Sequence, residues 1–173
     1  MAKDMMAVFD ATKAIEAMLY LAHKLSDSRI YTICKMLYLA DKISLEKYGR
    51  LIFGETYVAM EHGATPSNAY DLLKKSKDDH RFGLSVNDKY VTPLRKATLD
   101  YLSETDIECL NKVAELYDNA DSQRFDGVHD SAWEKAWDSR GAKGSNKMPL
   151  RSIVDTLPNS TELIEYLTGF ESN

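Results

Sequence analysis

A chain of 173 residues with 44% hydrophobic and 28% charged side chains is long enough to bury a core, and we expect residues 1–173 to form a single domain. Its net charge of −5 disfavours unaided nucleic-acid binding, which needs a concentrated positive surface. No run has the length of a membrane span, and the first residues lack the basic-then-apolar order of a signal peptide. The two separate cysteines, Cys34 and Cys109, predict no disulfide framework and favour a reducing cytoplasm.

The first half of the chain predicts two helices. Asp10 is expected to cap a helix over residues 11–25, and residues 26–28 (SDS) to end it and cap the next, so that the two form an antiparallel hairpin. The second helix, residues 30–48, is apolar around most of its circumference, and Gly49 fits its C-terminal stop. Such a helix is typical of the centre of a core, with other elements packed around it.

The middle of the chain predicts short β elements around one further helix. They are a strand over residues 57–60 that ends near Gly63, a helix over 67–75 after Pro66, a solvated charged loop over 74–80, and a hairpin over 82–86 and 90–93.

The last third predicts three more helices. Their start and stop signals are a capping box at residues 103–106 (SETD) that opens a helix to about Tyr117, Asp130 as the cap of a helix carrying Trp133 and Trp137, and a final helix from Asn159 or Ser160 to Leu167. The glycine-rich basic segment 140–151 is expected to be an exposed loop. The fold class is therefore predicted as mainly α, a single-domain helical bundle around a central apolar helix with a small β element.

The most tempting catalytic pattern spans Gly49 to Thr56, where Gly49 and Gly54 have the spacing of a phosphate-binding loop. That mechanism needs a lysine at the phosphates, but Glu55 stands there and a helix precedes the segment instead of a strand. The two glycines are better explained as a helix stop and a turn.

Metal binding and nucleophilic catalysis are disfavoured as well. The four histidines, His23, His62, His80 and His129, lack the short ligand spacings of structural zinc sites. Cys34 with His62 could supply a thiol and a base, but a cysteine on an apolar helix face is usually inert packing. We expect no cofactor, no metal and no enzymatic activity.

Two features exceed ordinary packing. Asp41 lies on the apolar face of the second helix; the favoured interpretation is a structural acid bonded to a helix start or a tyrosine, and the alternative is a groove residue that faces a partner. An aromatic set stands close in sequence to His62 or His129: Tyr57, Tyr70, Trp133 and Trp137. Aromatics at helical spacing are more often core, yet tryptophan and tyrosine also anchor protein interfaces.

The basic segment near the C-terminus offers a third, weaker signal. Arg140, Lys143, Lys147 and Arg151 could contact nucleic acid, but four cations in an acidic chain are better explained as a solvated loop.

Residues 35–41 (KMLYLAD) resemble the K-L-L-Y-L-A-D signature of the Panacea domain, the SocA-like antitoxin family often described as phage-associated. The resemblance extends over about residues 35–137 through further blocks: Gly49, residues 54–59 (GETYVA), His62-Gly63, Pro66, Tyr70-Asp71, residues 102–106 (LSETD) and residues 129–133 (HDSAW). The chain departs from the family at Leu51, where proline is common, and at Ala64-Thr65, which replace Pro-Val.

The resemblance implies a mostly α-helical, non-enzymatic protein encoded beside a toxin gene in bacteria or prophages. It implies an antitoxin that neutralises its toxin by direct binding, or a SocA-like adaptor that delivers the toxin to a protease; a nucleic-acid-binding regulator of its own operon is a further alternative. The residues expected to contact the partner are Tyr57, His62, Tyr70, Trp133 and Trp137. The signature residues expected to be structural are Lys35, Tyr38, Asp41, Gly49, Gly54, Gly63 and Pro66.

Overall fold

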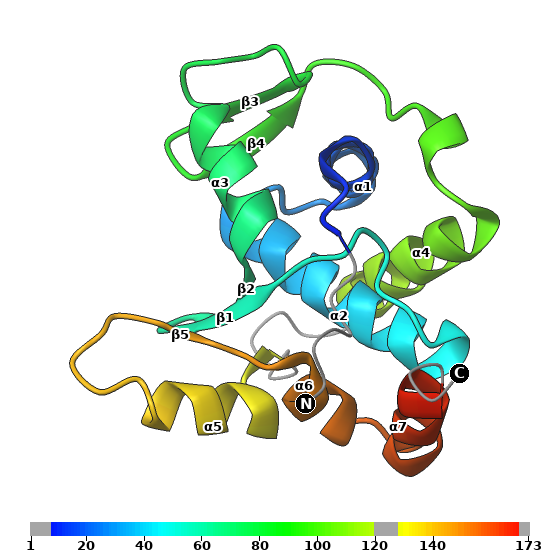
Figure 1. The fold of residues 1–173 in the computed structure, drawn as a ribbon. Helices are drawn as coiled ribbons and strands as arrows, with labels where there is room; N and C mark the ends of the chain where they lie inside the picture. Colours follow the sequence, from blue (N-terminus) through cyan, green and yellow to red (C-terminus); the bar gives the residue numbers. More distant parts are fainter. Residues whose placement is uncertain (1–7, 120–127, 170–173) are drawn as a thin grey trace.

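The computed structural model describes residues 8–119 and 128–169, and these residues are mainly α-helical (Figure 1). The helices are α1 (Ala11–Lys24), α2 (Ile30–Tyr48), α3 (Ser67–Lys75), α4 (Glu104–Asn119), α5 (Ser131–Asp138), α6 (Leu150–Asp155) and α7 (Ser160–Gly169), with a 3-10 turn η1 (Leu99–Tyr101). Most of the segment on which the signal-peptide expectation rests, residues 1–7, lies outside the described residues.

Two small antiparallel sheets accompany the helices. The first has the strand order β2-β1-β5, and the second is a hairpin of β3 and β4. The strands are β1 (Tyr57–Met60), β2 (Gly63–Pro66), β3 (Leu84–Asn87), β4 (Tyr90–Pro93) and β5 (Asn146–Lys147). In the hairpin, Val86 pairs with Val91 and both face the core. The predicted hairpin is thereby confirmed, with the turn falling at Asp88 and Lys89.

The helix boundaries follow the capping residues of the sequence. The Asp10 carboxylate accepts a hydrogen bond from the backbone N–H of Lys13 at 3.0 Å, and Asp130 does the same for Trp133 at 2.9 Å. Gly49 ends α2 in the left-handed conformation, with φ of 68°. These local signals placed both ends of α1 and α2, and the start of α5, within about a residue of the observed bounds, since a cap is made by residues that are neighbours in sequence.

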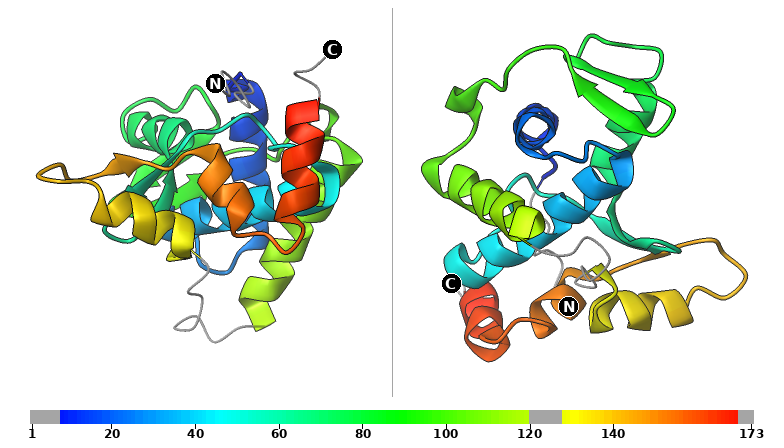
Figure 2. Two further views of the ribbon diagram at one scale, coloured as in Figure 1. Left: turned by 60° about the horizontal axis from the view of Figure 1, so that its bottom comes forward. Right: turned by 180° about the vertical axis from the view of Figure 1, so that it is seen from behind.

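The arrangement of the first two helices differs from the prediction. Figure 1 shows α1 along its axis while α2 runs across the view, and the rear view in Figure 2 agrees, so the helices cross steeply and do not form an antiparallel hairpin. The expected cap is also wrong: Arg29 is the N-cap of α2 and makes no side-chain capping bond. Asp27 instead accepts hydrogen bonds from the N–H of Arg29 and the hydroxyl of Thr32, which fixes the link between the helices.

α2 contributes to two hydrophobic clusters. The first is built from α1, α3, α4 and the β3–β4 hairpin, and Leu37 of α2 belongs to it. The second is built from β1, β2, α5, α6 and α7, and Tyr38 of α2 belongs to it. Successive helical residues point about 100° apart, so neighbours such as these serve different sides of the helix. Both side chains are fully buried.

The segment 140–151 is only partly the exposed loop that its composition predicts. Asn146 and Lys147 pair with β1, the N–H of Met148 donates to the carbonyl of Tyr57, and α6 starts at Leu150. Met148 is 2% exposed. Strand β2 was likewise missed, because its glycine and proline are typical of a turn. Pairing with β1 decides the conformation in both places; for β5 that contact is distant in sequence, whereas β2 follows β1 after a two-residue turn.

Replacing Gly63 with alanine should destabilise the fold. Its φ is +120°, and a Cβ there would lie 2.7 Å from Cγ2 of Val128 and 3.1 Å from the Val128 carbonyl oxygen. We expect Gly63→Ala to lower the free energy of unfolding by about 1–3 kcal/mol in urea titrations. Gly144→Ala is the matched control, since a Cβ at Gly144 meets nothing within 4 Å. Equal stability of the two variants would contradict the tight packing of the β1–β2 turn.

Candidate functional site

Asp41 is a buried carboxylate that ties α2 to the segment after it. Its side chain is 1% exposed and accepts hydrogen bonds from the backbone N–H of Ile52 at 2.8 Å and from the hydroxyl of Tyr57 at 2.6 Å. The Tyr57 hydroxyl also lies 3.2 Å from the carbonyl oxygen of Leu37. Asp41 therefore has the contacts of a structural acid bonded to a tyrosine. These bonds fix the start of β1 against the middle of α2.

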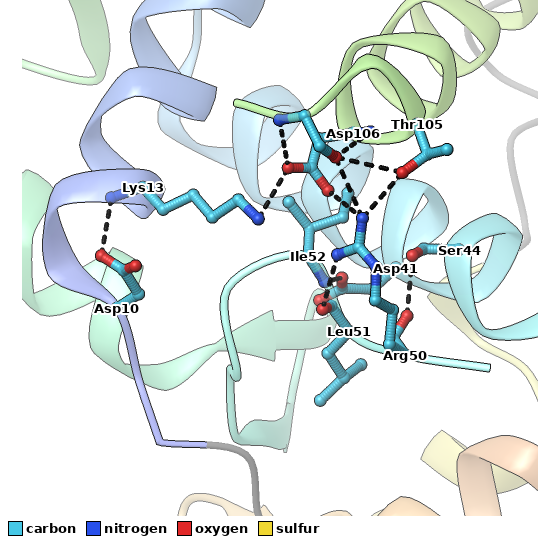
Figure 3. Close-up of polar contacts among 10 residues, drawn as sticks. Asp10, Lys13, Asp41, Ser44, Arg50, Leu51, Ile52, Thr105 and Asp106 are labelled. Atoms are coloured by element: carbon cyan, nitrogen blue, oxygen red, sulfur yellow. Dashed lines mark hydrogen bonds and ion pairs between the residues drawn. The ribbon is translucent and has the colours of Figure 1, made fainter. Parts of the chain in front are cut away.

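Near Asp41, Asp106 joins two helices and the segment after α2 (Figure 3). Its carboxylate is fully buried and lies 2.7 Å from Nζ of Lys13 and 2.9 Å from Nη2 of Arg50. It also accepts from the N–H of Ser103, whose hydroxyl accepts in return from the N–H of Asp106. The predicted capping box is thus present, and the same acid also binds α1 and the segment after α2.

The pKa values of Asp41 and Asp106 are shifted in opposite directions. Burial raises the pKa of Asp41 to about 7 against the hydrogen bonds that it accepts, and the negative charges of Glu55 and Asp106 contribute to the rise. Burial also opposes ionisation of Asp106, but hydrogen bonds from Lys13, Ser103 and Arg50 hold its pKa below the usual range. The cations make the difference, since Asp41 has neutral donors only.

Glu55 has a structural role that the sequence did not reveal. Its buried carboxylate accepts hydrogen bonds from the backbone N–H groups of Asn68 and Ala69 at 3.1 and 2.9 Å, and from the side chain of Asn68. It thereby caps α3, whose own N-cap residue Pro66 makes no side-chain bond. The capping acid stands 13 residues before Asn68, so no short-range motif could identify it.

Asp130 fastens α5 to α2. Besides capping α5, its carboxylate accepts a hydrogen bond from the Tyr38 hydroxyl at 2.5 Å and lies 2.9 Å from Nζ of Lys42. Both partners belong to α2, and Tyr38 packs edge-on against Tyr57 with ring centroids 4.9 Å apart. The orientation of α5 therefore depends on the same helix that carries Asp41.

One face of α5 and the β1–β2 turn form a partly exposed aromatic surface, which we call the α5 surface. Its members are His62, His129, Trp133, Trp137 and Arg140. The rings of Trp133 and Trp137 are stacked, with centroids 5.6 Å apart and planes 13° apart. His129 meets Trp133 edge-on at 4.5 Å, and the Arg140 guanidinium lies 3.7 Å from the centre of a Trp137 ring.

Hydrogen bonds hold the α5 surface in place. The indole N–H of Trp133 donates to the carbonyl of Met60 at 2.8 Å, which brings α5 to the turn that carries the exposed His62. Arg140 donates to the carbonyl of Trp137 at 2.7 Å and so ends the helix. The surface is therefore ordered before any partner binds.

Of the five residues expected to contact a partner, the structure brings Trp133 and Trp137 into contact. His62 lies in the neighbouring β1–β2 turn, where its ring meets that of Tyr31 edge-on at a centroid distance of 6.1 Å. Tyr57 is 2% exposed and lies in the core, so its expected place on an interface is wrong for this conformation. Tyr70 is half-buried on α3, where it packs against the first cluster with Nζ of Lys74 4.8 Å from its ring centre. It lies apart from the α5 surface.

The environment of Cys34 makes it a poor candidate for a nucleophile. Burial raises the pKa of the Cys34 thiol to about 12, which disfavours a thiolate nucleophile. Over residues 8–119 and 128–169, no group of three or more His, Cys, Asp or Glu side chains is arranged to hold a metal ion. No helix in these same ranges is long and apolar enough to cross a membrane.

The pKa of Asp41 predicts a pH dependence. The Asp41 carboxyl has a pKa near 3.8 in the unfolded chain and about 7 in the folded one. Protonation of Asp41 therefore stabilises the fold fully below pH 3.8, and this contribution is lost as the pH rises through 7. Between pH 5 and 7 the wild-type free energy of unfolding should fall, relative to Asp41→Asn, by about 1 kcal/mol per pH unit in urea titrations.

Asp106→Asn is the control for this experiment. The pKa of Asp106 is lowered from 3.8, so its contribution to stability stays constant from pH 5 to 7 and is lost only as the pH falls below the unfolded value. A wild-type advantage over Asp41→Asn that stays constant from pH 5 to 7 would contradict the environment described for Asp41.

Comparison with known families gives one match. The sequence model described as "Antitoxin SocA-like, Panacea domain" matches residues 33–137, which include most of α2, both β elements around α3, α4 and most of α5. No curated protein and no solved structure matches the chain significantly. Since the matched residues are more than half of the chain, it belongs to the SocA-like antitoxin family with the Panacea domain.

Proposed function

We propose that this chain is an antitoxin that neutralises a partner toxin, the product of an adjacent gene, by direct contact through the α5 surface. Membership of the SocA-like antitoxin family supports the kind of activity. The observation that carries the location is the stacked row of Trp133, Trp137 and Arg140 along α5. Tryptophan and arginine are the side chains that most often dominate the binding energy of protein interfaces.

The geometry of the row favours tight binding. Immobilising a flexible side chain in an interface costs about 0.5–1.5 kcal/mol. Here the rings are already stacked, Trp133 is bonded to Met60, and Arg140 is bonded to the end of its own helix. These side chains therefore already have the arrangement that a partner would bind, and most of the entropy cost of ordering them is met when the chain folds.

The base of the surface is equally well fixed. Asp130 holds the first turn of α5 against Tyr38 and Lys42, and the buried Ala132 and Ala136 pack the opposite face of the helix into the second cluster. A helix held at its start and along its inner face presents its outer side chains in one arrangement. We infer that neutralisation needs this arrangement and no chemical step.

Alanine at Trp137 should abolish neutralisation. The test is co-expression of the chain with the adjacent gene product, with growth as one readout and size-exclusion chromatography of the complex as the other. We expect Trp137→Ala to weaken binding by about 2 kcal/mol, roughly 30-fold in Kd, because it removes an indole and the support of Arg140.

The matched control is Tyr101→Ala, which removes another aromatic side chain, 56% exposed, from η1. It should leave growth rescue and complex formation unchanged. Rescue by Trp137→Ala equal to that of the control would remove the α5 surface as the contact site. Rescue by the wild type without any isolated complex would favour delivery of the toxin to a protease over direct masking.

A further inference from the structure

The loop between α5 and β5, residues 139–145, lies next to the α5 surface and is basic. The loop and β5 together carry three cations, Arg140, Lys143 and Lys147, and no acid. Figures 1 and 2 show that the loop extends away from the rest of the molecule. A Cβ built on Gly141 or Gly144 would meet nothing within 4 Å, so the space around the loop is open.

Both ends of the loop are anchored. At one end, Arg140 donates to the carbonyl of Trp137; at the other, the side chain of Asn146 donates to the carbonyl of Ala136 at 3.0 Å. Pairing of β5 with β1 and burial of Met148 hold the exit. The cations of the loop therefore keep a fixed relation to the Trp137 ring.

Among the described residues, Lys143 and Lys147 have no carboxylate partner. No Asp or Glu oxygen of the described residues lies within 4.0 Å of Nζ of Lys143 or Lys147, in contrast with Lys42, which pairs with Asp130. The set of charged residues over 131–147 contains four cations and two acids, Glu134 and Asp138, in a chain of net charge −5. Segment 131–147 thus carries a net charge of +2.

Arg140 is arranged to bind a carboxylate. The central carbon of its guanidinium lies 3.7 Å from the centre of a Trp137 ring, and Nη1 donates a hydrogen bond to the Trp137 carbonyl at the end of α5. A guanidinium has five N–H donors in a planar fork, so donors are left for a second acceptor. An arginine on an aromatic ring keeps this fork oriented for bidentate binding to a planar acid.

We propose that the partner presents an acidic protein segment to this loop, with one carboxylate on the Arg140 guanidinium beside Trp137 and others facing Lys143 and Lys147. This inference rests on the proposed function, because it assigns the chemistry of the partner at the α5 surface. Charge complementarity of this kind chiefly accelerates association. Three cations in an acidic chain disfavour nucleic acid as the occupant.

The experiment measures association rates with the purified adjacent gene product by surface plasmon resonance at several salt concentrations. Charge reversal in Lys143→Glu with Lys147→Glu should lower the association rate at low salt by about tenfold or more, and the difference should shrink as salt screens the charges. Arg140→Lys keeps the charge but loses the fork, and should raise the dissociation rate several-fold.

The control is Lys77→Glu with Lys96→Glu, an equal change of charge at two exposed lysines outside the α5 surface. It should leave both rates near wild type. The chain has two tryptophans, both on α5, so 5-fluorotryptophan labelling and 19F NMR report directly on contact at this surface.

Distinct outcomes separate the two proposals. No association of the wild-type chain rejects the proposed function and this inference with it. In a second outcome, the wild-type chain associates and shifts the fluorotryptophan signals, while the loop and control variants have equal rates and equal salt dependence. That result overturns the acidic segment of the partner and leaves the proposed function standing. Binding of duplex DNA at physiological salt that the loop variant loses would overturn the acidic segment as well, and would assign the loop to nucleic acid.

Discussion

The hydrogen bonds of Asp41 are the constraint on which the rest of the structure depends. An apolar helix face can bury a carboxylate only where donors replace water, and the donors here are the N–H of Ile52 and the hydroxyl of Tyr57. The bonds draw the segment after α2 back onto that helix, and β1 then begins beside Tyr38. β1 in turn pairs with β2 and β5, on which the second cluster is built.

Other buried or half-buried acids repeat this device at different points of the fold. Asp106 joins α4 to α1 and to Arg50, Glu55 caps α3, and Asp130 fastens α5 to α2. In each case one carboxylate accepts hydrogen bonds from segments that are distant in sequence. These bonds offset the cost of burying the carboxylate and fix how the elements lie against each other. The acids of the family signature are thus largely explained by the connections that they make.

Prediction from the sequence succeeded where structure is local and failed where it is not. The capping box at Ser103 and Asp106, the cap at Asp130 and the stop at Gly49 involve neighbouring residues, and the corresponding helices were expected. Strand β5 and the cap supplied by Glu55 depend on distant partners. The same distinction applies to the site: the spacing of Trp133 and Trp137 predicted a shared face, but only tertiary packing shows that Tyr57 is buried and that Arg140 completes the row.

The division of α2 between two clusters has a consequence for how the molecule unfolds. Leu37 and Tyr38 are adjacent in the chain but serve different sides of the helix, and both are fully buried. If one cluster came apart, one side of α2 would be exposed to water, while the other side would stay packed in the remaining cluster, which requires α2 to be helical. We therefore expect the amides of α2 to exchange with solvent only when both halves open together, so that the slowest hydrogen exchange in the chain marks its cooperative unit.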